Sequence, residues 1–341
     1  MIHAIPVQQA VGRVLAHDVT RIIPGREKGP AFKKGHIIQA AEVPALLKMG
    51  KEHIYVLDLK PGSLHENDAA ERIARAAAGP GLRLSEPSEG RINLHAEIDG
   101  LLKIDVDALT RINSIDKIVF STLHTLQPVR AGQAVAGTRV VPLVIAEDPI
   151  REVERICGTA FPLIQVKPYR SRRVGLVTTG SEVYHGRIAD GFGPVIREKC
   201  AALGCEVIRQ ILVSDDQPMT VAAIHDLIDE GAEMIMVTGG MSVDPDDRTP
   251  ASIRAAGGRQ VSYGAPIFPG AMFMLAYSGE VPVVGLPGCV MYYRTSIFDL
   301  VLPRLLADEP VTRETIAAMG HGGFCSGCPT CRYPLCGFGK G

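Results

Sequence analysis

The residues best suited to chemistry lie in one short stretch of the chain, residues 234–252. Its apolar start, 234–237, has the length of a buried parallel strand, and Gly239 and Gly240 allow a sharp turn directly after it. Three carboxylates follow close together, namely Asp244, Asp246 and Asp247. Such a cluster repels itself unless a hard divalent cation lies within it, which predicts a magnesium site.

Thr249 followed by Pro250 predicts the start of a helix, with Thr249 as the N-cap and Pro250 at the first helical position. The free N–H groups of this helix would point back at Gly239 and Gly240, where they favour an anion. The stretch therefore predicts a binding site for phosphate, called the phosphate seat below, beside the binding site for magnesium. On these residues alone, a surface turn with solvated aspartates is the alternative.

A second group of residues that could do chemistry consists of four cysteines near the end of the sequence. They have the spacing C-x2-C-x2-C-x4-C and are Cys325, Cys328, Cys331 and Cys336. Four thiolates this close can surround one ion or cluster, and the glycines and prolines between them permit the turns that this requires. The spacing predicts a zinc ion or a [4Fe–4S] cluster in a tail of residues 320–341. An unstructured, reactive tail is the alternative.

The composition of the chain limits its class and its partners. Its 341 residues are enough for two or three domains. Its formal net charge of −1 gives no electrostatic reason to expect nucleic acid or acidic lipid as the main partner, because binding to either needs a concentrated basic surface. Residues 1–19 interrupt their apolar positions with polar ones, so no signal peptide or membrane span is predicted. We therefore expect a cytoplasmic protein. The remaining cysteines have apolar neighbours and are expected to be buried thiols: Cys157, Cys200, Cys205 and Cys289.

The elements that must position the acidic stretch begin after Pro168, where strands alternate with helices. The predicted strands are 173–178, 205–213 and 234–237, and the predicted helices are 192–203, 218–230 and 249–256. This order predicts a three-layer, doubly wound α/β domain with a mainly parallel sheet. Ligands of such sheets bind beyond the carboxyl ends of the strands, where residues 178–182, 214–216 and 238–247 fall.

Further strands are predicted at 260–263, 273–277 and 281–285, followed by a long apolar helix at 290–306. Pro287 and Gly288 lie just ahead of that helix, so its N-terminus predicts a second anion seat facing the first. The alternative is that Pro287 and Gly288 only mark the start of the helix and bind no ligand.

The first half of the chain reads as two smaller, mostly-β parts, 1–60 and 61–146. In the first we expect a turn at Pro24 and Gly25, a polar loop at 26–35, a helix at 43–49 and a strand at 53–59. In the second we expect a helix at 68–78 capped by Asn67 or Asp68, a hairpin that turns at Asp99 and Gly100 between strands 92–98 and 101–109, and strands 117–123 and 138–145 around a loop at 128–137. A helix-like bridge at 150–157 leads to the α/β domain.

Four separated segments resemble the molybdopterin-binding domain shared by molybdopterin adenylyltransferases, molybdopterin molybdenumtransferases and gephyrin. They are TTGSE at 178–182, the paired aspartates at 215–216, TGGMSVDPDDRTP at 238–250 and GLPGCVM at 285–291. The resemblance covers about residues 170–307. A fainter likeness to the molybdenumtransferase extends over QAVGRVLAHDVT and residues 33–59.

The resemblance implies a site for molybdopterin or its adenylylated form. Asp247 falls on the family's essential aspartate and Glu182 on the glutamate of its TGDE-like loop, so both are the expected catalytic residues. Mg²⁺ would be held by these two, with Asp215 or Asp216 nearby. The remaining expected substrate contacts are Thr179, Gly180, Ser181, Gly239, Gly240, Ser242, Pro287 and Gly288.

The chain also departs from the molybdenumtransferase pattern. The DNSAMDGYA-like motif is absent after Pro24, the lysine-bearing KPGKP loop reads FPGAM at 268–272, and the PGNP loop reads PGCV at 287–290. Two functions therefore stay open. One is an enzyme of molybdenum or tungsten cofactor biosynthesis that inserts molybdate with Mg-assisted release of AMP. The other is a non-catalytic molybdopterin carrier, chaperone or sensor with a metal-bearing tail.

Three further expectations concern partners and alternatives. A molybdoenzyme or another cofactor-biosynthesis protein would be the protein partner, and the open edge of the sheet favours a homodimer. If the thiolates of the tail lie next to a molybdopterin site, they could transfer sulfur or a soft metal ion to the bound ligand. Phosphohydrolysis of another nucleotide is a third functional class, because a fold does not determine function.

Overall fold

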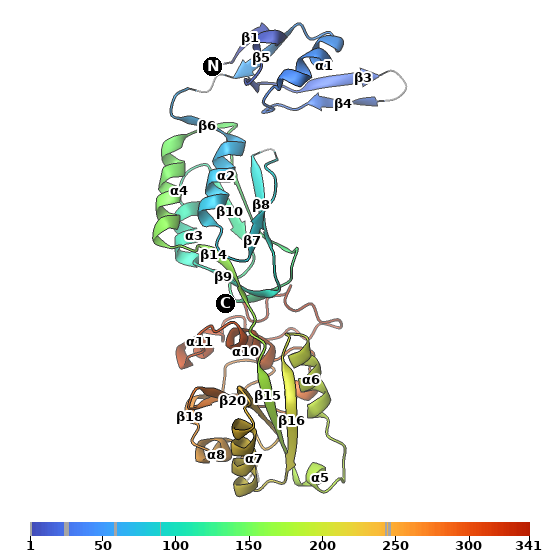
Figure 1. The fold of residues 1–341 in the computed structure, drawn as a ribbon, viewed down its shortest axis with the longest axis vertical. Coiled ribbons are helices and arrows are strands. Elements are labelled where there is room, and N and C mark those ends of the chain that lie inside the picture. The colour runs from blue at the N-terminus through green and yellow to red at the C-terminus, as the bar shows by residue number, and fades with distance from the viewer. Residues whose placement is uncertain (1, 24–26, 58–59, 89, 243, 245–246) are drawn as a thin grey trace. The chain divides into compact units, whose positions relative to one another are not determined.

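The computed structural model describes residues 2–23, 27–57, 60–88, 90–242, 244 and 247–341, and the chain forms two compact units (Figure 1). The first unit consists of residues 1–98, 102–125 and 129–166. The second consists of residues 99–101, 126–128 and 167–341. None of the helices among the described residues is long and apolar enough to cross a membrane.

The N-terminal part of the first unit is a small antiparallel sheet with the strand order β1-β5-β2. Its core contains Leu15, Leu46 and Val56, which are fully buried. The predicted helix and strand are present as α1 and β5, although residues 58–59 lie outside the described residues. The elements of this part are β1 (Ile2–Pro6), η1 (Val7–Gln9), β2 (Val14–Leu15), β3 (Val19–Ile23), β4 (Glu27–Phe32), η2 (Ala40–Glu42), α1 (Val43–Lys48) and β5 (His53–Leu57).

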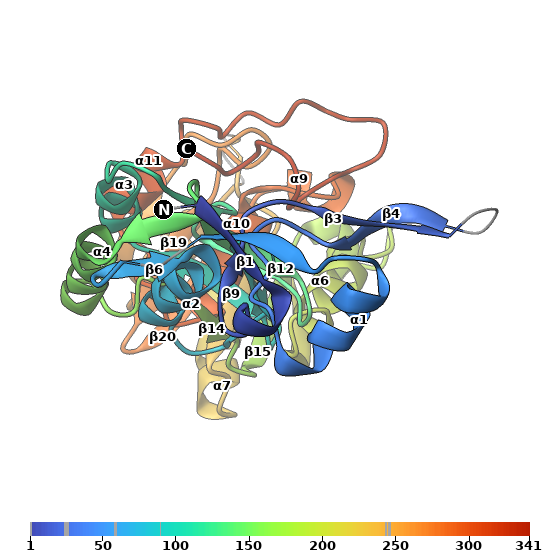
Figure 2. The ribbon, with the colours of Figure 1, turned by 90° about the horizontal axis from the view of Figure 1, so that it is seen from above.

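The prediction of a polar loop at 26–35 is wrong for most of that range. β4 (Glu27–Phe32) pairs antiparallel with β3 (Val19–Ile23), and Figures 1 and 2 show the two strands side by side as a ribbon. Backbone hydrogen bonds hold such a ribbon without the alternation of apolar residues by which strands are recognised in a sequence. The turn predicted at Pro24 and Gly25 lies outside the described residues.

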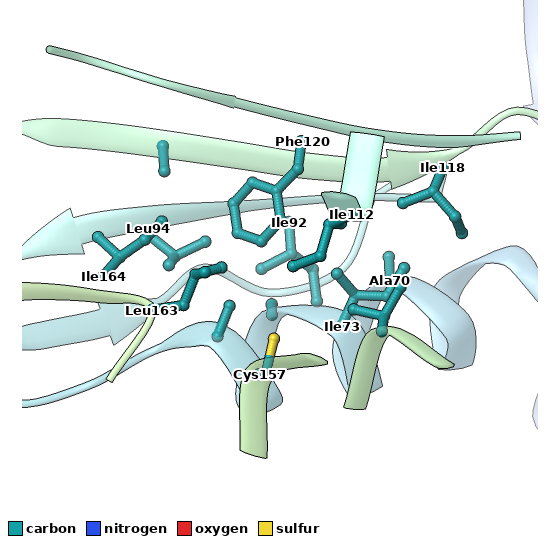
Figure 3. Packing of buried hydrophobic residues seen from close by; sticks show 14 of the residues in the cluster. Ala70, Ile73, Ile92, Leu94, Ile112, Ile118, Phe120, Cys157, Leu163 and Ile164 are labelled. Carbon is teal, nitrogen blue, oxygen red and sulfur yellow. The ribbon is translucent and has the colours of Figure 1, made fainter. Parts of the chain in front are cut away.

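The rest of the first unit contains a four-stranded antiparallel sheet with the order β10-β12-β8-β7 and three helices packed with it. Figure 3 shows Ile92, Leu94 and Phe120 of the sheet facing Ile73 and Cys157 of the helices. The elements are β6 (Ser63–His65), α2 (Glu66–Ala77), β7 (Leu82–Leu84), β8 (Arg91–Ala96), β9 (Gly100–Ile104), α3 (Val106–Asn113), β10 (Ile118–Thr122), β11 (Gln127–Val129), β12 (Ala134–Val140), β13 (Val144–Ala146), α4 (Glu147–Thr159) and β14 (Ile164–Pro168).

The predicted hairpin around Asp99 and Gly100 is wrong. β8 pairs with β12 and β7, whereas β9 belongs to a different sheet with the order β11-β9-β14. The second predicted strand also ends early, because the Asp105 carboxylate accepts a 2.8 Å hydrogen bond from the Ala108 N–H and so begins α3. An Asp-Gly turn reverses the chain locally, but pairing partners far along the chain decide which strands meet.

Two smaller predictions in this part also fail. His65 is the N-cap of α2, since its Nδ1 accepts from the Asn67 N–H at 3.2 Å, in place of the expected Asn67 or Asp68. The predicted loop at 128–137 contains the end of β11 and the start of β12.

The second unit contains the six-stranded sheet that carries the acidic stretch, with the order β16-β15-β17-β20-β19-β18. The first four strands are parallel, and β19 and β18 are antiparallel to their neighbours. The elements are β15 (Arg173–Thr179), α5 (Ser181–Tyr184), α6 (Phe192–Ala201), β16 (Glu206–Val213), α7 (Gln217–Asp229), β17 (Met234–Thr238), α8 (Thr249–Ala255), β18 (Arg259–Tyr263), β19 (Met274–Ser278), β20 (Val281–Leu286), α9 (Cys289–Tyr292), α10 (Ile297–Leu306) and α11 (Arg313–Ala318).

Helices cover both faces of this sheet. Met234 and Met236 of β17 belong to a buried cluster with residues of α6 and α10. Ile235 and Val237, which point the other way, belong to a second cluster with residues of α7 and α8. The predicted three-layer α/β domain with a mainly parallel sheet is therefore confirmed, as is the mostly-β N-terminal region.

The long helix predicted at 290–306 is wrong, because the chain forms α9, leaves the helix after Tyr292 and starts again as α10. Ser296 begins α10 through a capping box, in which the Ser296 N–H donates to the Asp299 carboxylate at 2.8 Å. The residues predicted as a loop after β15 also form the one-turn helix α5.

Candidate functional site

The two loops with the predicted chemistry leave the same end of the sheet. β15 and β17 are parallel neighbours, and Thr178 lies opposite Thr238 in their register. The loops that follow touch, since a Cβ atom on Gly239 would lie 2.2 Å from the carbonyl oxygen of Thr179. Gly239 and Gly240 also have positive φ angles of 85° and 54°. This close approach therefore requires glycine at position 239.

Buried hydroxyl groups hold the two loops in this position. The Thr238 hydroxyl donates to the Thr178 hydroxyl at 3.1 Å, and the Thr249 hydroxyl donates to the Gly239 carbonyl at 2.9 Å. Thr249 was predicted as the N-cap of the next helix, but Arg248 takes that place and Thr249 belongs to the first turn of α8. Its side chain fastens the glycine turn instead of the helix end.

Among the predicted carboxylates that the structure describes, Asp247 is the one that lines the same pocket as the glycine turn. It is half-buried and lines a pocket together with Gly239 and Gly240. The Asp247 N–H donates to the Asp244 carbonyl at 2.9 Å, and one Asp247 carboxylate oxygen accepts from the Asp244 N–H at 3.2 Å. Asp244 is exposed, and Asp246 lies outside the described residues.

Three further predicted acids follow the neighbouring strands β15 and β16 and are not among the residues that line this pocket: Glu182, Asp215 and Asp216. The Asp215 carboxylate accepts from the Ser181 N–H at 2.9 Å and thereby ties together the loops after β15 and β16. Asp216 caps α7, because its carboxylate accepts from the Met219 N–H at 2.8 Å. Glu182 is exposed on α5, and its carboxylate lies beside Gly180.

The pocket has a volume of about 640 Å³ and lies beyond the carboxyl ends of β17 and β20. Four segments of the chain line it: the residues after β17, the loop at 268–272, the residues after β20 and the C-terminal tail. Among the lining residues that the structure describes, none is a lysine or arginine and Asp247 is the single carboxylate. The predicted substrate contacts in its wall are Gly239, Gly240, Ser242, Pro287 and Gly288.

The donor set suits magnesium better than a metal that needs a complete protein cage. Within the described residues no group of three His, Cys, Asp or Glu side chains is arranged to hold a metal ion. Mg²⁺ commonly takes one or two carboxylates together with phosphate oxygens of a ligand. Asp247 in the wall of this pocket supplies one such carboxylate, whereas structural zinc needs four ligands at once.

Within the described residues the tail cysteines are not grouped as a metal ion would require, so the predicted zinc or iron–sulfur site stays a prediction. Cys325 is fixed where its N–H donates to the Phe268 carbonyl at 2.8 Å, and the Cys331 sulfur lies 3.1 Å from the Thr295 hydroxyl. Cys336 packs against the buried cluster of the α/β domain, and Cys328 is exposed. These separate anchors hold the thiols apart.

The cysteines predicted as buried thiols are buried in three cases. Burial raises the pKa of Cys157 to about 11 and that of Cys200 to about 12, and it also raises the pKa of Cys205. These thiols stay protonated and unreactive at neutral pH. Cys289 is only half-buried, since it lines the pocket.

Sequence reasoning missed the aromatic part of the pocket wall. Phe268, Tyr293 and Phe324 line the pocket, and none of them was expected to contact a ligand. Phe268 lies in the loop that the resemblance had already singled out. Phe324 carries no local signal, because its place beside the pocket depends on a contact with a loop far earlier in the chain.

Comparison with known proteins now identifies the domain that carries this pocket. Residues 175–307 match the family described as probable molybdopterin binding domain. The α/β domain belongs to this family. Residues 4–58 match a second family, which is described as a domain of unknown function.

The curated relatives of this chain include CinA-like proteins. The protein of Mycobacterium avium is 34% identical over 98 residues, which are 28% of this chain and 22% of the relative. That of Mycobacterium tuberculosis is 33% identical over 92 residues, which are 27% of this chain and 21% of the relative. The chain thus spans about a fifth of the length of the curated relatives that it matches.

Solved structures similar to the chain include two proteins named MoaB. The molybdopterin biosynthesis enzyme MoaB of Thermus thermophilus is 25% identical, with a TM-score of 0.34 over 41% of this chain and 98% of that chain. The tungsten cofactor synthesizing protein MoaB of Pyrococcus furiosus is 24% identical, with a TM-score of 0.31 over 36% of this chain and 84% of that chain.

Proposed function

We propose that the chain binds molybdopterin or its adenylylated form and acts in the biosynthesis of the molybdenum or tungsten cofactor. The observation that carries this proposal is the position of the pocket. It lies in the domain that matches the molybdopterin-binding family, beyond the ends of parallel strands, and has Gly239, Gly240, Gly288 and Asp247 in its wall.

The glycine turns supply the seat for the phosphate groups. Backbone N–H groups near Gly239, Gly240 and Gly288 donate to phosphate oxygens, and the lack of side chains lets the ligand approach the backbone closely. Because no described lysine or arginine lines the pocket, most of the ligand's negative charge needs another counter-charge.

Asp247 would hold Mg²⁺ together with phosphate oxygens of the ligand, with Glu182 and with Asp215 or Asp216 as further candidates. When bound, this ion neutralises the pyrophosphate while the phosphoanhydride bond is cleaved. Water adds to the phosphorus on the molybdopterin side, the P–O bond to AMP breaks, and AMP leaves while one proton passes to solvent. Two Mo–S bonds form as the two dithiolene S–H bonds and one Mo–O bond of molybdate break, and the displaced oxygen leaves as water. The contribution of the chain is mainly positioning and charge neutralisation.

The release of AMP tests this proposal. Adenylylated molybdopterin is incubated with the full chain, Mg²⁺ and molybdate, and AMP is quantified by chromatography. We expect Asp247→Asn to slow the release by about 100-fold, and Glu182→Gln to slow it less. Asp229→Asn at the exposed end of α7 is the matched control. Release that continues at the normal rate in Asp247→Asn would reject the assigned role.

A second candidate function is a non-catalytic carrier, chaperone or sensor for the cofactor. It is favoured by the loop at 268–272, which lines the pocket without a cationic side chain. Tight binding of molybdopterin with no AMP release would select it. A panel of other nucleotides with Mg²⁺ covers the third class, phosphohydrolysis of a different substrate.

The finer expectations about assembly also belong to this proposal. We expect a homodimer, a cofactor-biosynthesis protein or molybdoenzyme as partner, and a cytoplasmic location. Light scattering of the purified chain measures the oligomeric state. Anaerobic purification followed by metal analysis shows whether the tail holds zinc or iron, for which its four cysteines would have to leave their present anchors.

A further inference from the structure

One wall of the pocket comes from outside the molybdopterin-binding domain. That domain ends at residue 307, whereas Phe324, Cys325 and Gly327 line the pocket. After α11 the tail forms no helix or strand within the described residues, and Figure 2 shows it as an extended loop. The inference drawn from this wall concerns the same site as the proposed function and rests on it.

The backbone of the tail is fastened to the loop at 268–272. The Phe268 N–H donates to the Gly323 carbonyl at 2.8 Å, and the Cys325 N–H donates to the Phe268 carbonyl at 2.8 Å. Gly323 is packed tightly, since a Cβ atom there would lie 2.5 Å from the Met319 carbonyl oxygen. Phe324 is therefore held beside the pocket by its two neighbours in sequence.

The far end of the tail is anchored separately in the core of the same domain. Phe338 is 4% exposed and belongs to the buried cluster that contains Phe298 and Leu300 of α10. The Tyr333 hydroxyl donates to the Asp299 carbonyl at 3.0 Å. With an anchor on each side of the cysteines, the wall is a built part of the fold.

Phe324 of the tail lies beside Phe268 of the loop at 268–272, and both aromatic side chains are exposed. Phe324 is 77% exposed and Phe268 is 58% exposed, and their ring centroids are 6.4 Å apart with an angle of 50° between the planes. Tyr293, which is 54% exposed, lines the same pocket. Exposed aromatic side chains that gather at a pocket are typical of ligand sites, because water solvates them poorly.

We propose that Phe324 and Phe268 receive the planar heteroaromatic ring of the ligand, while its phosphate lies on the glycine turns. The faces of aromatic rings carry partial negative charge, so they disfavour the phosphate and favour a flat ring with polar edges. The pocket thus has an apolar aromatic side and a backbone N–H side, which sets the orientation of the ligand. The tail is in this way a specificity-determining part of the site.

Binding of neopterin phosphate tests the proposal, with inorganic pyrophosphate as a probe of the phosphate seat alone. The chain contains no tryptophan, so the fluorescence of the pterin ring is measured against a low protein background. We expect Phe324→Ala and Phe268→Ala to weaken neopterin phosphate binding by about tenfold and to leave pyrophosphate binding unchanged. Phe324→Tyr keeps the ring and is expected to restore the affinity.

Two control variants remove an exposed apolar side chain elsewhere. Leu335 is 71% exposed in the same tail, and Phe161 is 63% exposed in the first unit. Neither lines the pocket, so alanine at either position should leave both affinities unchanged. Because Phe324 is mostly exposed, its alanine variant is expected to keep the melting temperature of the parent chain. A Phe324→Ala chain that binds neopterin phosphate as tightly as the parent overturns the proposal.

The experiment distinguishes failure of the aromatic contact from failure of the proposed function. If the parent chain binds neither neopterin phosphate nor molybdopterin, the proposed function fails, and AMP and flavin mononucleotide then serve as ring-bearing probes. Loss of their binding in Phe324→Ala, with pyrophosphate unaffected, would support the aromatic wall without the pterin. If no ring-bearing phosphate binds the parent chain, or if only a protein partner protects Phe324, the proposal is rejected.

Discussion

The Thr238 hydroxyl donates a hydrogen bond of 3.1 Å to the hydroxyl of Thr178 on the neighbouring strand. The two residues are partners in the parallel register of β15 and β17, so the loops that follow them start at the same level of the sheet. The phosphate seat depends on this register, because it brings the glycine turn after Thr238 against Thr179.

The first prediction concerns Gly239→Ala. The new Cβ atom would lie 2.2 Å from the Thr179 carbonyl oxygen, and φ is +85°. Gly257→Ala is the matched control, since its φ is +82° and nothing lies within 4 Å of the added atom. We expect Gly239→Ala to lower the free energy of unfolding by about 1–3 kcal/mol more than the control, and to weaken pyrophosphate binding. Denaturant titration and calorimetry measure the two effects. Equal stability of the two variants would contradict the close contact.

A second prediction tests the hydroxyl that fastens the glycine turn. Thr249 is 2% exposed and its hydroxyl donates to the Gly239 carbonyl at 2.9 Å. Thr249→Val keeps the shape of the side chain but leaves this carbonyl without its donor, and we expect a loss of about 1–3 kcal/mol in the free energy of unfolding. Thr249→Ser keeps the donor and should lose less. Chemical denaturation measures both variants; a valine variant as stable as the parent would show that this hydrogen bond does not stabilise the glycine turn.

The third prediction concerns thiol reactivity. Cys328 and Cys331 are exposed, whereas Cys157, Cys200 and Cys205 are buried and have raised pKa values. At pH 8 the buried thiols remain protonated, so a thiol reagent should modify the two exposed cysteines first and the buried ones only on unfolding. Mass spectrometry of timed samples identifies the modified positions. Protection of the tail cysteines that a chelator removes would show that they hold a metal after all.

The fourth prediction is a pH dependence in the first unit. Arg72 of α2 donates to the carboxylates of Glu147 at 2.7 Å and Glu154 at 2.8 Å. These hydrogen bonds hold the pKa of both carboxyl groups below their ordinary value of 4.5. A lowered pKa in the folded state stabilises the fold above the ordinary value, and this stabilisation is lost as the pH falls through the folded-state pKa.

Arg72→Met tests this ion-pair network. We expect the variant to melt about 2–4 °C lower than the parent at pH 7 and to approach it as the pH falls through the lowered pKa of the two carboxyl groups. Arg75→Met on the same helix is the control, because the Arg75 side chain is 69% exposed and pairs with Glu71 within α2 itself. Hydrogen exchange of the α2 and α4 amides reports on this part of the chain. A constant difference across the pH range would reject the network as its source.

Much of the α/β domain could be predicted because its signals are local. The strand predicted at 234–237 is an uninterrupted apolar run and agrees with β17 to within one residue. The helix predicted at 218–230 ends at a glycine and agrees with α7 to within one residue at each end. The break between α9 and α10 was missed although it also has a local signal. Ser296 followed by Asp299 is a capping box, but the apolar residues around it favoured one long helix.

Pairing between distant segments could not be predicted in the same way. The Asp99-Gly100 turn suggested a hairpin, yet β8 and β9 pair with strands from other parts of the chain. The candidate site shows the same limit. Gly239 and Asp247 were identified from their own neighbourhood, whereas the contact of Phe324 with Phe268 joins two segments whose sequences carry no sign of each other.

Phe324 lies outside the residues that match the molybdopterin-binding family, although it borders the same pocket as Phe268 and Asp247 within them. Under the proposals made above, Phe324 contributes to the choice of the ring, whereas Asp247 acts at the phosphate from a stretch of sequence 77 positions earlier. A substitution at Phe324 would therefore change which ring the pocket accepts and leave the phosphate side of the pocket as it is.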